Sequence, residues 1–175
     1  MKIPVIKGTK FILRPFKEGD EKSLVKNLNN KNIIKNLANV PFPYRLKHAK
    51  SWIEINLKEH QNKKSTIAVF VIDVGGDVVG SVAFHKIVPG HKAEVGYWLE
   101  EDYWGQGIMT EALRLITEFG FGKLKLRRLQ LDAYSFNKAS MRVAEKAGYG
   151  FEGIMKKGVK KDGKFIDVHI YSKIK

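Results

Sequence analysis

The segment Tyr103–Leu113 constrains this chain most, because it places two glycines where a strand gives way to a helix. Glu94–Leu99 before it alternates as a strand does, and from Ile108 onwards apolar residues recur at helical spacing. Gly105 and Gly107 permit backbone conformations and close approaches that a side chain would block. The first turn of a helix leaves about four amide groups without intrahelical partners and carries partial positive charge. The segment is therefore suited to bind an anion such as a phosphate or a pyrophosphate.

Two familiar phosphate-binding motifs are excluded by the spacing of these glycines. A Walker loop ends in Gly-Lys-Ser or Gly-Lys-Thr, and Gly105-Gln106-Gly107 has no such ending. A dinucleotide fingerprint needs a third glycine three residues after Gly107, where this chain has Thr110. Taken alone, the segment also fits a tight strand-to-helix turn that binds nothing.

Composition indicates a single domain over residues 1–175, which is long enough to bury a core. No Pro/Ser-rich linker, membrane-length apolar run or signal-peptide pattern is found, so we expect a cytoplasmic protein without a membrane partner. The absence of cysteine excludes disulfides, thiolate metal sites and a cysteine nucleophile. The five histidines are scattered and include no i,i+4 pair, so no metal site is expected.

The formal net charge is +14. Such a charge attracts anions such as CoA, acidic peptides or RNA, although the Lys-rich and Asn-rich composition also fits the codon usage of an AT-rich genome. The densest basic groups, at 123–128 and 156–164, are not interleaved with exposed aromatics as in a nucleic-acid stacking platform. We therefore interpret them as solvated faces, and nucleic acid is not the expected substrate.

Hydrophobic periodicity and turn residues predict a mixed sheet with helices on its faces. Asp20 is the expected N-cap of the first helix, and residues 29–45 form a loop with room for one short helix. Strands are predicted at 9–15, 66–74, 78–86, 92–99, 127–133, 149–159 and 164–173. Further helices are predicted at 47–60, 108–122 and 137–147.

Several separated segments together resemble the GNAT N-acetyltransferases, and within them the group of ribosomal-protein N-terminal acetyltransferases. They are the strand and glycine turn over 94–111, Asn137–Ser140, Glu145–Gly153, Phe11–Pro15 and Asp162–Asp167. The resemblance spans nearly the whole chain. It implies an α/β GNAT fold with a mixed, mostly antiparallel sheet of six or seven strands, flanked by helices, in which a splayed pair of parallel strands holds CoA.

The resemblance implies acetyl-CoA as cosubstrate, with its pyrophosphate on the amides of the glycine turn and its pantetheine arm between the strands 92–99 and 127–133. Asn137 matches the family residue that contacts this arm, and it also fits an ordinary helix cap. The predicted cofactor-binding residues are Trp98, Leu99, Trp104, Gly105, Gln106, Gly107, Ile108, Met109, Thr110 and Asn137.

The chain departs from the general family pattern at a few positions. Trp104 stands where Gln or Arg is usual, and Met109 where a small residue is common; binding through backbone groups tolerates both. Ala144 replaces a tyrosine that many members use to protonate the departing thiolate. The narrower group suggests Ser140 as the substitute acid, although Ser140 also fits a polar residue in a first helical turn.

Glu94 is the predicted general base for amine acetylation. Strand alternation places Glu94 on the same face as Gly96, which leaves space for a substrate. The alternative is an exposed strand acid paired with a lysine. A main-chain N–H near Trp98 or Leu99 is the natural donor to the oxyanion, and direct transfer needs no covalent acetyl-enzyme.

The expected acceptor is a primary amine, and by resemblance a protein N-terminus. A small amine, such as a polyamine, an aminoglycoside or another antibiotic, is the alternative, as is a non-catalytic CoA-binding or ribosome-associated module. Val159 stands where related ribosomal-protein enzymes carry an additional acid, and Asp167 either holds the last hairpin or lines the acceptor cleft. The oligomeric state, monomer or homodimer, stays open.

Overall fold

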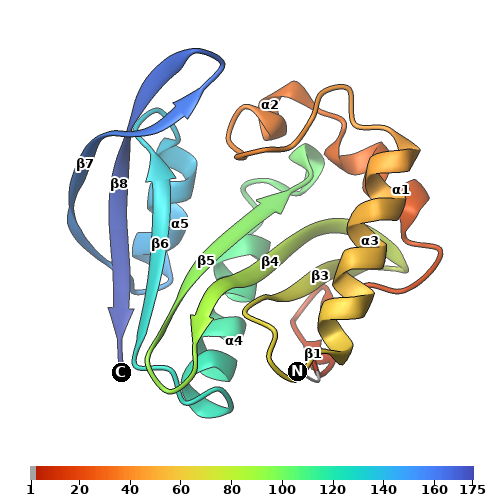
Figure 1. The fold of residues 1–175 in the computed structure, drawn as a ribbon, viewed down its shortest axis with the longest axis horizontal. Coiled ribbons are helices and arrows are strands. Elements are labelled where there is room, and N and C mark those ends of the chain that lie inside the picture. The colour runs from red at the N-terminus through yellow and green to blue at the C-terminus, as the bar shows by residue number, and fades with distance from the viewer. Residues whose placement is uncertain (1–2) are drawn as a thin grey trace.

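The computed structural model describes residues 3–175, and the first two residues of the predicted domain lie outside this range. The described residues form strands that pair into one sheet and helices that pack around it, and Figure 1 marks the chain ends. The strands are β1 (Ile6–Lys7), β2 (Ile12–Arg14), β3 (Ala68–Val74), β4 (Asp77–Val88), β5 (Lys92–Leu99), β6 (Arg128–Tyr134), β7 (Gly150–Lys161) and β8 (Lys164–Ile174). The helices are α1 (Glu21–Leu28), α2 (Lys31–Ile34), α3 (Leu46–Gln61), α4 (Ile108–Gly122) and α5 (Lys138–Lys146), with a 3₁₀ turn at Glu101–Tyr103.

All eight strands form one sheet in the order β1-β2-β3-β4-β5-β6-β8-β7. Only β5 and β6 are parallel; every other neighbouring pair is antiparallel. The mixed, mostly antiparallel α/β sheet with one parallel pair is confirmed, but the sheet has eight strands, one more than the upper end of the expected six or seven. The additional strand, β1, is only two residues long, and no periodicity can be detected over that length.

The first predicted strand and its helix cap need correction. The strand predicted at 9–15 is shortened to Ile12–Arg14, because Gly8 donates its amide to the carbonyl of Phe11 in a turn at 2.9 Å. Asp20 does precede α1, yet its side chain does not cap the helix. Both of its carboxylate oxygens instead accept hydrogen bonds from the buried Arg14 at 2.8 Å.

Two apolar clusters cover the two faces of the sheet. One contains the buried faces of α4 and α5, including Leu113 and Ile116. The other contains the buried faces of α1 and α3, including Leu24 and Ile53. Within residues 3–175 no helix is both long and apolar enough to cross a membrane.

The parallel pair β5–β6 separates part-way along its length, as Figure 1 shows. Its register runs from Lys92 opposite Arg128 to Val95 opposite Leu131 and continues no further, although β5 extends to Leu99. On its other side β5 remains paired with β4, and Glu100 donates its amide to Val79 at 2.8 Å. Alternation along a strand then turns the main-chain groups of Tyr97 and Leu99 away from β4, towards the opening.

Candidate active site

A cavity of about 660 Å³ lies at the open end of the β5–β6 pair. Its walls are the end of β5, the glycine turn, the first turn of α4, one face of α5, Ile33 of α2 and residues 35–37 after α2. All the predicted cofactor-binding residues line it except Gln106, and the predicted acid Ser140 lines it as well. The fold thus collects residues from widely separated segments around one hollow.

The glycine turn presents free amides to this cavity. Gly105 and Gly107 have φ angles of +74° and +81°, in the left-handed region that L-residues rarely adopt. The first hydrogen bond of α4 runs from the Glu111 amide to the Gly107 carbonyl, so the three amides of residues 108–110 have no intrahelical acceptor. A Cβ added at either glycine would meet no atom within 4 Å, so the space beside the two glycines is open.

Trp104 and Gln106 are both turned back onto the protein. The Trp104 indole donates to the Leu99 carbonyl at 2.8 Å, which fastens the turn to the end of β5. The Gln106 amide donates to the Asp102 carbonyl at 2.9 Å, and Gln106 is exposed. Trp104 therefore takes a structural position in the turn, and the side chain of Gln106 does not reach the cavity.

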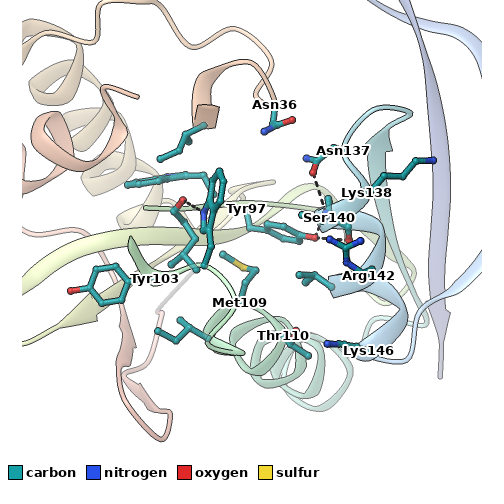
Figure 2. A pocket seen from close by; sticks show the side chains of 18 of the residues that line it. Asn36, Tyr97, Tyr103, Met109, Thr110, Asn137, Lys138, Ser140, Arg142 and Lys146 are labelled. Atoms are coloured by element: carbon teal, nitrogen blue, oxygen red, sulfur yellow. Dashed lines mark hydrogen bonds between the residues drawn. The ribbon is translucent and has the colours of Figure 1, made fainter. Parts of the chain in front are cut away.

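Tyr97, Ser140 and Asn137 form one hydrogen-bonded group (Figure 2). The Tyr97 hydroxyl lies 2.9 Å from the Ser140 hydroxyl and donates to the Ser140 carbonyl at 3.2 Å. Asn137 accepts the Ser140 amide at 3.1 Å and so caps α5. Burial raises the pKa of Tyr97, so this phenol stays protonated at neutral pH. Sequence reasoning missed Tyr97, although alternation along β5 places it on the face opposite Glu94.

Three cations of α5 line the cavity across from the start of α4: Lys138, Arg142 and Lys146. Residues four apart lie on one face of a helix, so this spacing was visible in the sequence but was not used. Figure 2 shows the three side chains along the α5 wall. Together with the free amides of the glycine turn, they make this part of the cavity electropositive.

Glu94 lies apart from this group. It does not line the cavity. Its side chain is 37% exposed on the other face of the sheet and forms a salt bridge with Lys86 at 2.9 Å. Burial raises the pKa of Asp132 in β6, and the nearby charge of Glu94 raises it further. His85 lies opposite Glu94 on β4, and burial lowers its pKa, so it is neutral at neutral pH.

Asp167 holds the last hairpin together. Its carboxylate accepts a hydrogen bond from the Lys157 amide at 2.8 Å and forms a salt bridge with Lys156 at 3.0 Å. The hydrogen bond from Lys157 is the main reason that the pKa of Asp167 is lowered. Across residues 3–175 no three His, Asp or Glu side chains lie close enough to hold a metal ion.

The family described as the acetyltransferase (GNAT) domain matches residues 10–150 of this chain. The chain belongs to the GNAT acetyltransferase family. GNAT enzymes use acetyl-CoA as cosubstrate, and the open strand pair, the free amides and the cationic wall fit that ligand.

Similar proteins agree with this assignment. A relative called probable N-acetyltransferase YjcK, from Bacillus subtilis, is 42% identical over 51% of this chain, a match that spans about half of that relative's length. A structure of RimL, described as a ribosomal L7/L12 alpha-N-protein acetyltransferase in complex with coenzyme A, superimposes with a TM-score of 0.87 at 26% identity and covers 98% of both chains. The microcin C7 self immunity acetyltransferase MccE, in complex with acetyl-CoA and AMP, has a TM-score of 0.83 at 30% identity and covers 96% of this chain and 94% of its own.

Proposed function

We propose that this chain, as one domain, transfers the acetyl group of acetyl-CoA directly to a primary amine, and that the amine is a protein N-terminus. The observation that carries the proposal is the interrupted β5–β6 ladder, which ends at the Val95–Leu131 pair although β5 continues to Leu99 and leads into the glycine turn. The main-chain groups of Tyr97 and the amide of Leu99 face this opening, where an extended ligand arm can pair with them as a further strand would; the Leu99 carbonyl is already bonded to the Trp104 indole. An amide-containing chain that ends in a pyrophosphate fits both features at once.

In this proposal, the amides of residues 108–110 bind the pyrophosphate, and the α5 cations balance its charge. The Asn137 side-chain oxygen is occupied by the Ser140 amide, so its amide nitrogen is the group available to the cofactor arm. Trp98, Leu99, Trp104, Gly105, Gly107 and Met109 line the rest of the binding surface, whereas we assign no ligand contact to Gln106.

Transfer forms an N–C bond, breaks the C–S bond and moves one proton from the amine towards the sulfur. Glu94 is the proposed acceptor of the amine proton, and Ser140, hydrogen-bonded to the protonated Tyr97, is the proposed donor to the thiolate. Leu99 supplies the oxyanion donor better than Trp98, because the main-chain groups of Trp98 point to β4. Since Glu94 and Tyr97 lie on opposite faces of β5, the amine approaches from one side of the sheet and the sulfur leaves on the other.

Two findings support a protein N-terminus as acceptor. The RimL structure belongs to an alpha-N-protein acetyltransferase, and the net charge of +14 disfavours polycationic acceptors at long range. The test is thiol release from acetyl-CoA with peptides that begin with Ser or Ala, their N-blocked forms, spermidine and an aminoglycoside. Turnover is expected only with free peptide amines. If thiol is released only with spermidine or the aminoglycoside, the acceptor is a small amine and not a protein N-terminus. Tight CoA binding without thiol release from any acceptor would favour a non-catalytic module.

A further inference from the structure

An amine of the protein itself is bound to the proposed base. The Lys86 ammonium lies 2.9 Å from a carboxylate oxygen of Glu94, and the Lys86 side chain is 75% exposed. The hydrogen bond to Glu94 and the charge of Glu94 raise the pKa of Lys86, and the charge of Asp132 raises it further to a smaller extent. A protonated primary amine is the chemical group that an acetyl acceptor presents before it loses its proton.

The backbone directs Lys86 to this position. The β4–β5 register shifts between His85 and Val88, and Lys86 takes a φ of +49° within the irregularity. A bulge in a strand redirects the side chains next to it, and bulges are frequent beside active sites. A non-glycine residue in the left-handed region carries a conformational cost that the surrounding structure must offset.

The neighbouring groups make a subsite for one cation. Glu94 and Asp132 come from the two strands that separate, and Asp132 follows the last paired residue of β6, Leu131. The side-chain amide of Gln130 donates to one carboxylate oxygen of Asp132 at 3.0 Å. The second carboxylate oxygen of Asp132 can therefore accept another donor. His85 beside Glu94 is neutral, and the charges that act on Asp132 are those of Glu94 and of the Lys86 ammonium.

We propose that Lys86 occupies the acceptor's place: its ammonium fills a subsite made by Glu94 and Asp132, and an acceptor amine binds by displacing it. This inference rests on the proposed function, because it names the surface where that function's acceptor binds. The exchange of one ammonium for another leaves the charge of the subsite unchanged. Once Lys86 has left, Glu94 is free to take the proton of the incoming amine, and Asp132 is a positioning residue for the cation.

The exposure of the Lys86–Glu94 ion pair sets the size of the expected change in acceptor affinity. Ion pairs as exposed as Lys86–Glu94 contribute at most about 1 kcal/mol, which corresponds to about fivefold in an equilibrium constant. Removing the Lys86 ammonium should therefore strengthen acceptor binding by about twofold to fivefold. An increase in affinity separates this proposal from a structural role, since loss of a structural contact would not improve binding.

The experiment compares Lys86→Met, Lys86→Arg and Lys58→Met with the wild type. Lys58 is the matched control, because it is 73% exposed and pairs with Glu54 at 2.6 Å on α3, away from the sheet opening. Lys86→Met should lower the acceptor KM about twofold to fivefold, whereas kcat and the KM for acetyl-CoA stay unchanged. Lys86→Arg and Lys58→Met should match the wild type, and Asp132→Asn should raise the acceptor KM.

A second measurement does not depend on turnover. Calorimetric titration of CoA-saturated protein with the peptide Ser-Ala-Ala-Ala-amide reports the dissociation constant of the acceptor directly. Tighter binding to Lys86→Met than to wild type and Lys58→Met supports displacement; equal or weaker binding overturns it. If the wild type binds the peptide but releases no thiol with any amine, the proposed function fails, and the Lys86→Met titration still decides this inference.

Discussion

Gly107→Ala tests whether the glycine turn binds the pyrophosphate of CoA. At φ +81° an L-residue costs about 1–2 kcal/mol more than glycine, and the added methyl meets no atom of the protein within 4 Å. The free energy of unfolding should therefore fall by about that amount, without a packing defect. We expect the methyl, which stands in open space at the start of α4, to crowd the phosphate proposed to bind the amides of residues 108–110.

The expected loss of CoA affinity can be calculated from the hydrogen bonds that these amides would donate. A hydrogen bond from an amide to a charged group is worth about 1.5–3 kcal/mol, so the loss of one such bond weakens CoA binding about 10-fold to 150-fold. Calorimetric titration with CoA at 25 °C measures this ratio, and urea unfolding measures the change in stability.

Gly90→Ala is the matched control. Gly90 has a φ of +71°, would also place its Cβ in open space, and lies in the turn between β4 and β5 outside the cavity. It should lose a similar free energy of unfolding and bind CoA as the wild type does. If Gly107→Ala binds CoA within twofold of Gly90→Ala, the phosphate assignment of the turn is refuted.

Four further substitutions test the remaining assignments. Ser140→Ala should lower kcat about 100-fold or more, as expected for loss of a general acid, and Tyr97→Phe only about fivefold, through loss of one hydrogen bond; the reverse order in steady-state kinetics would make Tyr97 the proton donor. Glu94→Gln should lower kcat at neutral pH and leave the Kd for CoA unchanged, and an unaltered kcat would remove Glu94 from the reaction. Arg14→Met should reduce the free energy of unfolding by about 3–5 kcal/mol in urea titrations, because it leaves two buried aspartates without their ion pairs; a loss below about 1 kcal/mol would contradict this.

Local signals predicted most of the fold. The strand at 92–99 and the helix at 108–122 agree with β5 and α4 to the residue, since alternation and helical spacing are strong there and glycines mark the junction. The errors lie where local pattern is weak or misleading. A two-residue strand has no period, and Asp20 has the position of a cap but bonds to Arg14, which no local rule reveals.

Sequence alone therefore predicted the glycine turn, its anion-binding end and the assignment of Glu94 and Tyr97 to opposite faces of a strand, because each depends on spacing within a few residues. Tertiary structure decided the rest. The pairing of β5 with β6 and the packing of α5 bring Tyr97 to Ser140, 43 residues away. Lys161 donates to the carbonyls of Ile34 and Leu37, more than 120 residues earlier. The Lys86–Glu94 pair depends on the β4–β5 register, and a shift of one residue would turn one of the two side chains to the other face. Contacts between distant segments follow from how strands pair and helices pack, and the local pattern of residues does not encode that register.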